Sequence, residues 1–115
     1  MAEGDQAAMT DHCQLIPIRD LKHHDIRGEE RWTGWVRLPG YTPRHVLVLR
    51  HEGRLIAVRN SCPHHGVAML QGKLDKNCGT LECPSHGWEL SLAGPDLAPL
   101  PVVETKEGMA VEFAG

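Results

Sequence analysis

The sequence predicts an all-β fold, in which short antiparallel strands form a sandwich or barrel and a small hairpin subdomain carries a metal site. Three observations support this prediction. Apolar and β-branched residues occur in short runs that are separated by turns rich in Gly, Pro, Asn and Asp. No segment repeats its apolar residues at the spacing of a long helix. Two short cysteine–histidine motifs flank a pattern typical of a small hairpin.

Length and composition indicate one ordinary globular domain. The chain has 115 residues, of which 41% are hydrophobic and 23% are charged, and its formal net charge is −3. No run of Lys or Arg occurs, so we expect no nucleic-acid partner. We expect residues 1–12 to be a disordered tail and residues 13–115 to form a single domain, with the metal-binding subdomain at about 60–95.

The N-terminus lacks a basic region and an apolar region, so it does not resemble a secretory signal. No apolar run reaches the length of a membrane span. We therefore expect a cytoplasmic protein with no membrane partner. Because the cytoplasm is reducing, we do not expect Cys13 and Cys78 to form a structural disulfide, and Cys78 lies in a run typical of a turn.

The N-terminal third contains two predicted strands. Cys13–Ile18 predicts a short strand, which we expect at a sheet edge because Pro17 cannot donate a backbone hydrogen bond. Asp20–Glu30 is highly polar, and we expect a loop or a frayed helical turn there. Arg31–Leu38 has β-forming residues around Gly34 and predicts a strand with a bulge.

The clearest local signal is a hairpin in the middle of the chain. His45–Arg50 and Leu55–Arg59 are two β-rich runs, and the four residues His51–Arg54 between them contain Gly. We expect the side chains of His45 and His51 to lie at the surface.

The C-terminal half predicts further short strands. The expected elements are a small hairpin of Lys73–Leu74 and Thr80–Glu82, a strand at Trp88–Leu92, a loop at Gly94–Pro101, and a closing hairpin of Val102–Thr105 and Met109–Phe113. Between them, Val67–Leu70 is expected to pack beneath the first motif.

The two motifs read Cys62-Pro63-His64 and Cys83-Pro84-Ser85-His86, with 18 residues between them. Two thiols and two imidazoles can close a four-ligand metal site. A mixed set of this kind suits tetrahedral zinc. It also suits a 2Fe–2S cluster with two cysteines on one iron and two histidines on the other.

The wider patterns C-P-H-x-G and C-P-x-H-G-W resemble the two ligand boxes of the Rieske 2Fe–2S proteins. Gly94-Pro95 stands where that family has a third loop over the cluster, and the resemblance covers roughly residues 44–113. It implies a Rieske-type all-β fold and one 2Fe–2S cluster. The implied ligands are Cys62, His64, Cys83 and His86. A zinc-stabilised interaction module is the alternative from another class.

The resemblance also implies a function. We expect a soluble electron-transfer protein, a Rieske-type ferredoxin that passes single electrons from a flavoprotein reductase to a terminal oxygenase component. The chain is too short to add the large domain of a complete oxygenase, so we expect a carrier that is not catalytic alone. Within the family, the alternative is the small 2Fe–2S subunit of a larger reductase such as nitrite reductase.

Other motif positions have physical roles. Pro63 and Pro84 fix φ after each cysteine and stiffen both loops. We expect Gly66 and Gly87 to permit close approach of the backbone. The resemblance further implies a rim of exposed side chains for partner docking, formed by His64, His65, His86, Trp88 and Pro95.

High-potential members of the family carry an extra cysteine in each box. Val67 and Ser85 stand at those positions here, so no disulfide can form between them. We therefore expect a potential in the low part of the range of about −150 to +300 mV.

Overall fold

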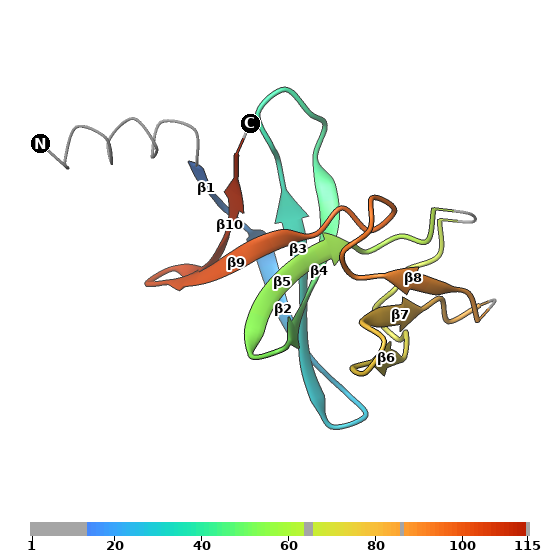
Figure 1. The fold of residues 1–115 in the computed structure, drawn as a ribbon. Helices are drawn as coiled ribbons and strands as arrows, with labels where there is room; N and C mark the ends of the chain where they lie inside the picture. Colours follow the sequence, from blue (N-terminus) through green and yellow to red (C-terminus); the bar gives the residue numbers. More distant parts are fainter. Residues whose placement is uncertain (1–13, 64–65, 86, 115) are drawn as a thin grey trace, which may run out of the picture.

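The structure is a computed structural model that describes residues 14–63, 66–85 and 87–114. Its described residues form ten β-strands and no helix, which confirms the all-β prediction (Figure 1). The strands are β1 (Gln14–Pro17), β2 (Arg19–Ile26), β3 (Glu29–Val36), β4 (Arg44–His51), β5 (Arg54–Arg59), β6 (Leu74–Asp75), β7 (Thr80–Glu82), β8 (Glu89–Ser91), β9 (Leu100–Thr105) and β10 (Gly108–Phe113). Within these ranges, no helix is present that could cross a membrane. The cytoplasmic location stays a prediction.

Seven strands form a large antiparallel sheet in the order β1-β10-β9-β5-β4-β3-β2. The predicted edge position of β1 is confirmed, and so is the closing hairpin of β9 and β10. The β4–β5 hairpin turns at Glu52-Gly53, where both residues have positive φ, as a tight two-residue turn requires. His45 and His51 on β4 are half-buried, so their predicted surface position was wrong.

The predicted loop at Asp20–Glu30 was wrong, because these residues form most of strand β2 and its turn into β3. Arg27 and Gly28 have φ of 53° and 84° and make a two-residue hairpin turn. β2 is an edge strand that is exposed along most of its length. Its sequence therefore shows no alternation of apolar and polar residues. Its pairing with β3, which depends on residues elsewhere in the chain, decides its conformation.

Strand β3 is confirmed, but the irregularity predicted at Gly34 lies in its partner. The pairing of β2 with β3 shifts register between Arg19 and Lys22. A Cβ atom on Gly34 would contact the Ile18 side chain and lie 2.8 Å from the Arg19 carbonyl oxygen. Gly34 is therefore required by the close approach of a neighbouring segment, and not by a bulge.

Strand β4 is buried on both faces and separates two hydrophobic cores. Val46 and Val48 belong to the first core, within the curled large sheet. Leu47 and Leu49 alternate with them and belong to the second core. That second core comprises Leu47, Leu49, Val58, Cys62, Met69, Leu81, Cys83, Leu90, Leu92 and Leu97. β4 thus packs beneath Cys62 and Cys83, the cysteines of the two motifs.

Strands β6, β7 and β8 form a separate three-stranded sheet beside the large one (Figure 1). We call the described residues between 60 and 99 the small lobe. The hairpin predicted around 75–79 is confirmed by the pairing of β6 with β7. Met69 is fully buried, and Val67 and Leu70 pack against the second core, as predicted for this segment.

Candidate metal centre

Cys62 and Cys83 are brought together in one core from segments far apart in the chain. Their exposed fractions are 2% and 0%, and both belong to the second core. Cys62 follows the end of β5, and Cys83 follows the end of β7 directly. The end of the large-sheet strand β5 and the end of the small-sheet strand β7 therefore each lead to one thiol, and both thiols lie in an environment from which water is excluded.

The first motif forms a tight loop closed by two backbone hydrogen bonds. The Cys62 N–H donates to the Val67 carbonyl over 2.7 Å. The Gly66 N–H donates to the Cys62 carbonyl over 2.7 Å. Gly66 has a φ of +69°, a conformation that side chains disfavour.

The second motif repeats this geometry. The Cys83 N–H donates to the Trp88 carbonyl over 2.7 Å, and the Gly87 N–H donates to the Cys83 carbonyl over 2.9 Å. Gly87 has a φ of +70°. The two loops thus share both hydrogen bonds and the glycine conformation, and each presents a buried cysteine at the same position. Paired loops of this kind suit a site with two equivalent halves.

The backbone conformation of the motif glycines is sufficient to require glycine. Among the described residues, a Cβ atom on Gly66 or Gly87 would meet nothing nearer than 3.7 Å, and both residues have positive φ. The approach of their backbone to the cluster stays a prediction. Close approach operates at Gly72, where a Cβ atom would collide with the Glu82 carbonyl oxygen. Gly72 lies between the motifs and was not identified from the sequence.

The predicted ligands His64 and His86 lie outside the described residues, as does His65. Within the part of the chain that the structure describes, no group of three or more Cys, His, Asp or Glu could hold a metal ion. The described half of the predicted set consists of two soft sulfur donors in an apolar, dry setting. Such donors fit an iron–sulfur cluster, whose iron is bound by thiolate.

Asn60, which is 6% exposed, joins the first loop to the large sheet. Its Oδ1 accepts the Met69 N–H over 2.8 Å, and its Nδ2 lies 3.1 Å from His45 Nδ1. Burial lowers the pKa of His45, and the nearby charges of Lys22 and His24 lower it further. His45 is therefore a partner of the first loop and not a surface residue.

Arg31 on β3 joins the small lobe to the large sheet at a second place, a role that was not predicted from the sequence. Its residue is 1% exposed, and its Nη1 donates to the carbonyls of Leu70 and Gly72, each over 2.7 Å. Arg27 adds a bond from Nη2 to the Gln71 carbonyl over 2.6 Å. The burial pattern along β3 does not alternate regularly, so it gave no signal for an inward-facing Arg31.

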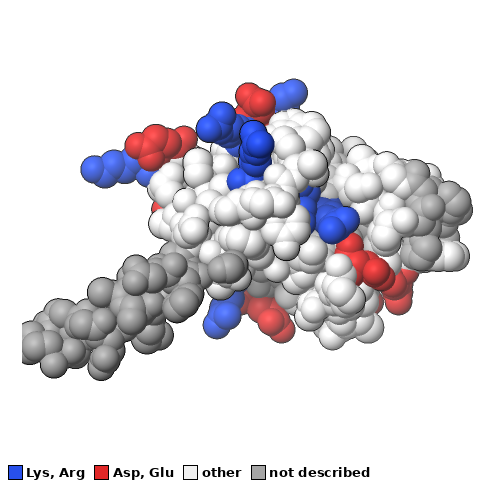
Figure 2. Space-filling view, turned by 90° about the horizontal axis from the view of Figure 1, so that it is seen from above, with Lys and Arg blue, Asp and Glu red and all other residues white. Residues whose placement is uncertain are grey.

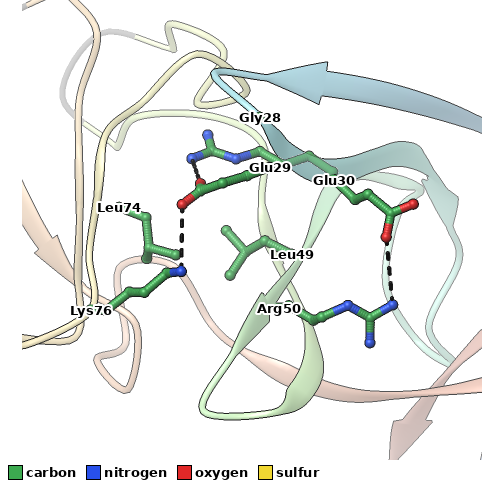
Figure 3. A pocket seen from close by; sticks show the side chains of 8 residues that line it. Gly28, Glu29, Glu30, Leu49, Arg50, Leu74 and Lys76 are labelled. Atoms are coloured by element: carbon green, nitrogen blue, oxygen red, sulfur yellow. Dashed lines mark hydrogen bonds and ion pairs between the residues drawn. The ribbon is translucent and has the colours of Figure 1, made fainter.

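Ion pairs surround Arg31 at the junction of the lobe and the sheet. Glu29 Oε1 lies 3.0 Å from Arg31 Nη2, and Glu29 Oε2 lies 3.8 Å from Lys76 Nζ. Figure 3 shows Glu29 facing Lys76 and Glu30 facing Arg50 around a pocket of about 270 Å³. These acidic and basic side chains pair with each other at the junction of the small lobe and the large sheet.

Some apolar side chains stay exposed near the motifs. Trp88, whose carbonyl closes the second loop, is 50% exposed, and Pro95 is also exposed. On the face seen in Figure 2, charged side chains gather mainly over the large sheet, and the described outer part of the small lobe carries few. Trp88 and Pro95 therefore meet the exposure expected of rim residues.

Cys78 lies in the exposed turn after β6, as predicted. A hydrogen bond with the Asp75 carboxylate raises the pKa of its thiol, which disfavours the reactive thiolate form. The geometry thus separates this cysteine from the two buried ones. Cys13 lies outside the described residues.

Two comparisons with known proteins agree with the geometry. A family model described as the Rieske [2Fe-2S] domain matches residues 13–105, so the match also includes the N-terminal strands that the resemblance did not cover. The chain is similar to the "Alkene monooxygenase system, ferredoxin component" of Xanthobacter autotrophicus (strain ATCC BAA-1158 / Py2), with 32% identity over 84 residues. The aligned region is 72% of this chain and 68% of that protein.

No solved structure gave a significant match. The family match decides between the two metals that the motif spacing left open, because the cofactor of a Rieske domain is a 2Fe–2S cluster and not zinc. On these findings, the chain belongs to the Rieske [2Fe-2S] domain family.

Proposed function

We propose that this chain is a Rieske-type ferredoxin, an electron carrier that is not catalytic alone. Cys62 and Cys83 hold one iron of its cluster, and His64 and His86 hold the other. The observation that carries the proposal is the pair of matching loops, each with a buried cysteine at the same position. The named ferredoxin component among its relatives supports the same role.

The residues around the two thiols prepare this site for electron transfer. A 2Fe–2S cluster supplies one-electron redox chemistry when it is bound. The second core keeps water from the sulfur atoms of Cys62 and Cys83. The hydrogen bonds that close each loop fix the backbone, so that the ligands need little rearrangement when the charge changes.

The partners are proposed from the relative and from the exposed rim. We infer a flavoprotein reductase as the electron donor and an oxygenase component as the acceptor, because the relative is named as a component of an alkene monooxygenase system. The Trp88 carbonyl accepts a hydrogen bond from the Cys83 N–H, and the Trp88 residue is half-exposed. Trp88 therefore suits a contact with either partner.

The ligand assignment can be tested with matched cysteine variants. We expect Cys62→Ser and Cys83→Ser to lose the visible absorption of the cluster and most of the bound iron and sulfide, because a hydroxyl is a weak ligand for iron. Cys78→Ser is the control, since this cysteine is exposed and lies in a turn. Equal loss in all three variants, or a full cluster in Cys62→Ser, would contradict the assignment.

Electron transfer itself is tested by reductive titration. The wild-type protein is expected to take up one electron for each pair of iron atoms. It should then return that electron to an acceptor without consuming a substrate of its own. Turnover of an organic substrate by the isolated protein would overturn the assignment as a carrier.

A further inference from the structure

Asn60 is a polar side chain in a position where the matching loop has an apolar one. It precedes Cys62 by two residues, and Leu81 precedes Cys83 by the same interval. Leu81 is fully buried in the second core. Asn60 is also buried, at 6% exposure. Because burying an amide is costly unless its polar atoms are bonded, its presence in the first loop requires a specific reason.

The contacts of Asn60 bridge three segments. Its backbone N–H donates to the His45 carbonyl over 3.0 Å, which continues the pairing beyond the end of β5. Its side-chain Oδ1 accepts the Met69 N–H over 2.8 Å. Residues 60 and 69 bracket the whole first ligand loop. A single side chain thus closes that loop at its base and joins it to β4.

The second polar atom of the amide selects one form of His45. Since Oδ1 accepts a backbone N–H, the atom that faces His45 Nδ1 is the Nδ2 donor. His45 Nδ1 must then be the acceptor, so the imidazole is neutral and carries its proton on Nε2. Lys22 and His24 on β2 are the charged groups near this ring, and Trp35 on β3 packs against it with ring centroids 4.8 Å apart and a tilt of 41° between the planes.

We propose that Asn60 is the positioning residue of the first ligand loop. It holds Cys62 at a fixed distance from the sheet by linking the backbone of Met69 to the neutral imidazole of His45. This role rests on the proposed function, because it matters for electron transfer only if Cys62 is an iron ligand. Asn60 acts through the backbone and His45, and it is not itself a ligand.

Three substitutions separate the parts of this network, and a fourth is their control. Asn60→Leu matches the residue of the second loop but leaves the buried Met69 N–H without an acceptor. Asn60→Asp keeps an oxygen for Met69 but replaces the Nδ2 donor that faces His45 with an acceptor. Asn77→Asp is the matched control, because Asn77 lies exposed in the turn of the same lobe and the change adds the same charge. His45→Phe keeps a ring beside Trp35 and removes the acceptor for Nδ2.

The first readout is hydrogen exchange at the Met69 amide, measured with and without iron. We expect Asn60→Leu to speed this exchange about tenfold or more, because an unsatisfied buried donor opens readily. Asn77→Asp should keep the protection of wild type, whereas Asn60→Asp and His45→Phe, which both remove the link between Nδ2 and His45, should lie between wild type and Asn60→Leu. Wild-type protection in Asn60→Leu would overturn the proposal.

The second readout is the midpoint potential, which a residue that serves only stability would leave unchanged. We expect the potential of Asn60→Leu to shift from wild type, and its cluster to be lost several-fold faster, whereas Asn77→Asp changes neither the exchange at Met69 nor the rate of cluster loss. An unchanged potential in an iron-loaded Asn60→Leu protein would refute the positioning role alone. A wild-type protein without iron and sulfide would instead refute the proposed function, and Met69 exchange would still decide the role of Asn60 in the loop.

Discussion

Replacing Arg31 with methionine should release the small lobe from the large sheet. The methionine side chain fills much of the same volume, so Arg31→Met removes the polar contacts without opening a large cavity. The lost contacts are the Nη1 bonds to the carbonyls of Leu70 and Gly72 and the Nη2 bond to Glu29. Because the first two carbonyls belong to the segment after the first ligand loop, we expect both stability and cluster retention to fall.

The size of the effect follows from the partners that remain. A hydrogen bond from a charged donor contributes about 1.5–3 kcal/mol. Gly72 keeps a bond from Arg27, and Glu29 keeps Lys76, so the main loss falls on the Leu70 carbonyl. Removal of the buried Arg31 Nε, which has no hydrogen-bond partner among the described residues, offsets part of the loss. We therefore expect a net destabilisation of about 2 kcal/mol, within the range for one hydrogen bond from a charged donor.

Thermal unfolding of the purified protein measures this loss. At about 4 °C for each kcal/mol in a domain of this size, the midpoint of Arg31→Met should fall by about 8 °C. Arg50→Met is the matched control, because its guanidinium is 51% exposed and lies 3.7 Å from Glu30. A pair of this kind contributes about 0–1 kcal/mol. Bleaching of the cluster absorption at a fixed temperature should be faster in Arg31→Met alone.

Equal thermal unfolding midpoints for Arg31→Met and Arg50→Met would refute the role of Arg31 at the junction. The link between the junction and the cluster would be refuted if Arg31→Met lost stability but its cluster absorption bleached at the wild-type rate. In that case the small lobe would hold its cluster without help from the sheet.

Three further predictions concern pH, docking and potential. Because burial, Lys22 and His24 lower the pKa of His45 below its ordinary value of 6.5, the unfolded chain binds more protons in acid. The stability of the iron-free protein should therefore fall as the pH drops below about 6.5 and level off below the lowered pKa, and a denaturation series across pH should show no such loss in His45→Phe. Trp88→Ala should slow reduction by a flavoprotein reductase several-fold, whereas Tyr41→Ala, at a similarly exposed position, should not; equal rates in stopped-flow traces would remove Trp88 from the docking surface. Voltammetry should give a midpoint at neutral pH in the low part of the range of about −150 to +300 mV, and a value well above zero would exclude a low-potential carrier.

Most of the architecture could be predicted because it is encoded locally. The β4–β5 hairpin has apolar runs on both sides of a Glu-Gly turn, and the small hairpin before Cys83 surrounds a run of turn residues. β2 could not be predicted in this way. Six of its eight residues are polar and most are exposed, so it shows no apolar alternation, and its conformation depends on pairing with β3.

The cysteines of the site could be predicted from motif spacing, but their supports could not. Asn60, Gly72 and Arg31 act through backbone atoms of segments that lie far away in the chain or fold back on it. No local pattern records such contacts.

The most direct test of the central claim is pulsed electron paramagnetic resonance of the reduced protein, produced with ¹⁵N-labelled histidine. A 2Fe–2S cluster held by Cys62, Cys83, His64 and His86 should show strong couplings from two directly bound histidine nitrogens. His86→Ala should not retain that pair of couplings. A cluster signal without any histidine coupling would contradict the ligand assignment, and a purified protein that contains zinc and gives no cluster signal would contradict the electron-carrier function.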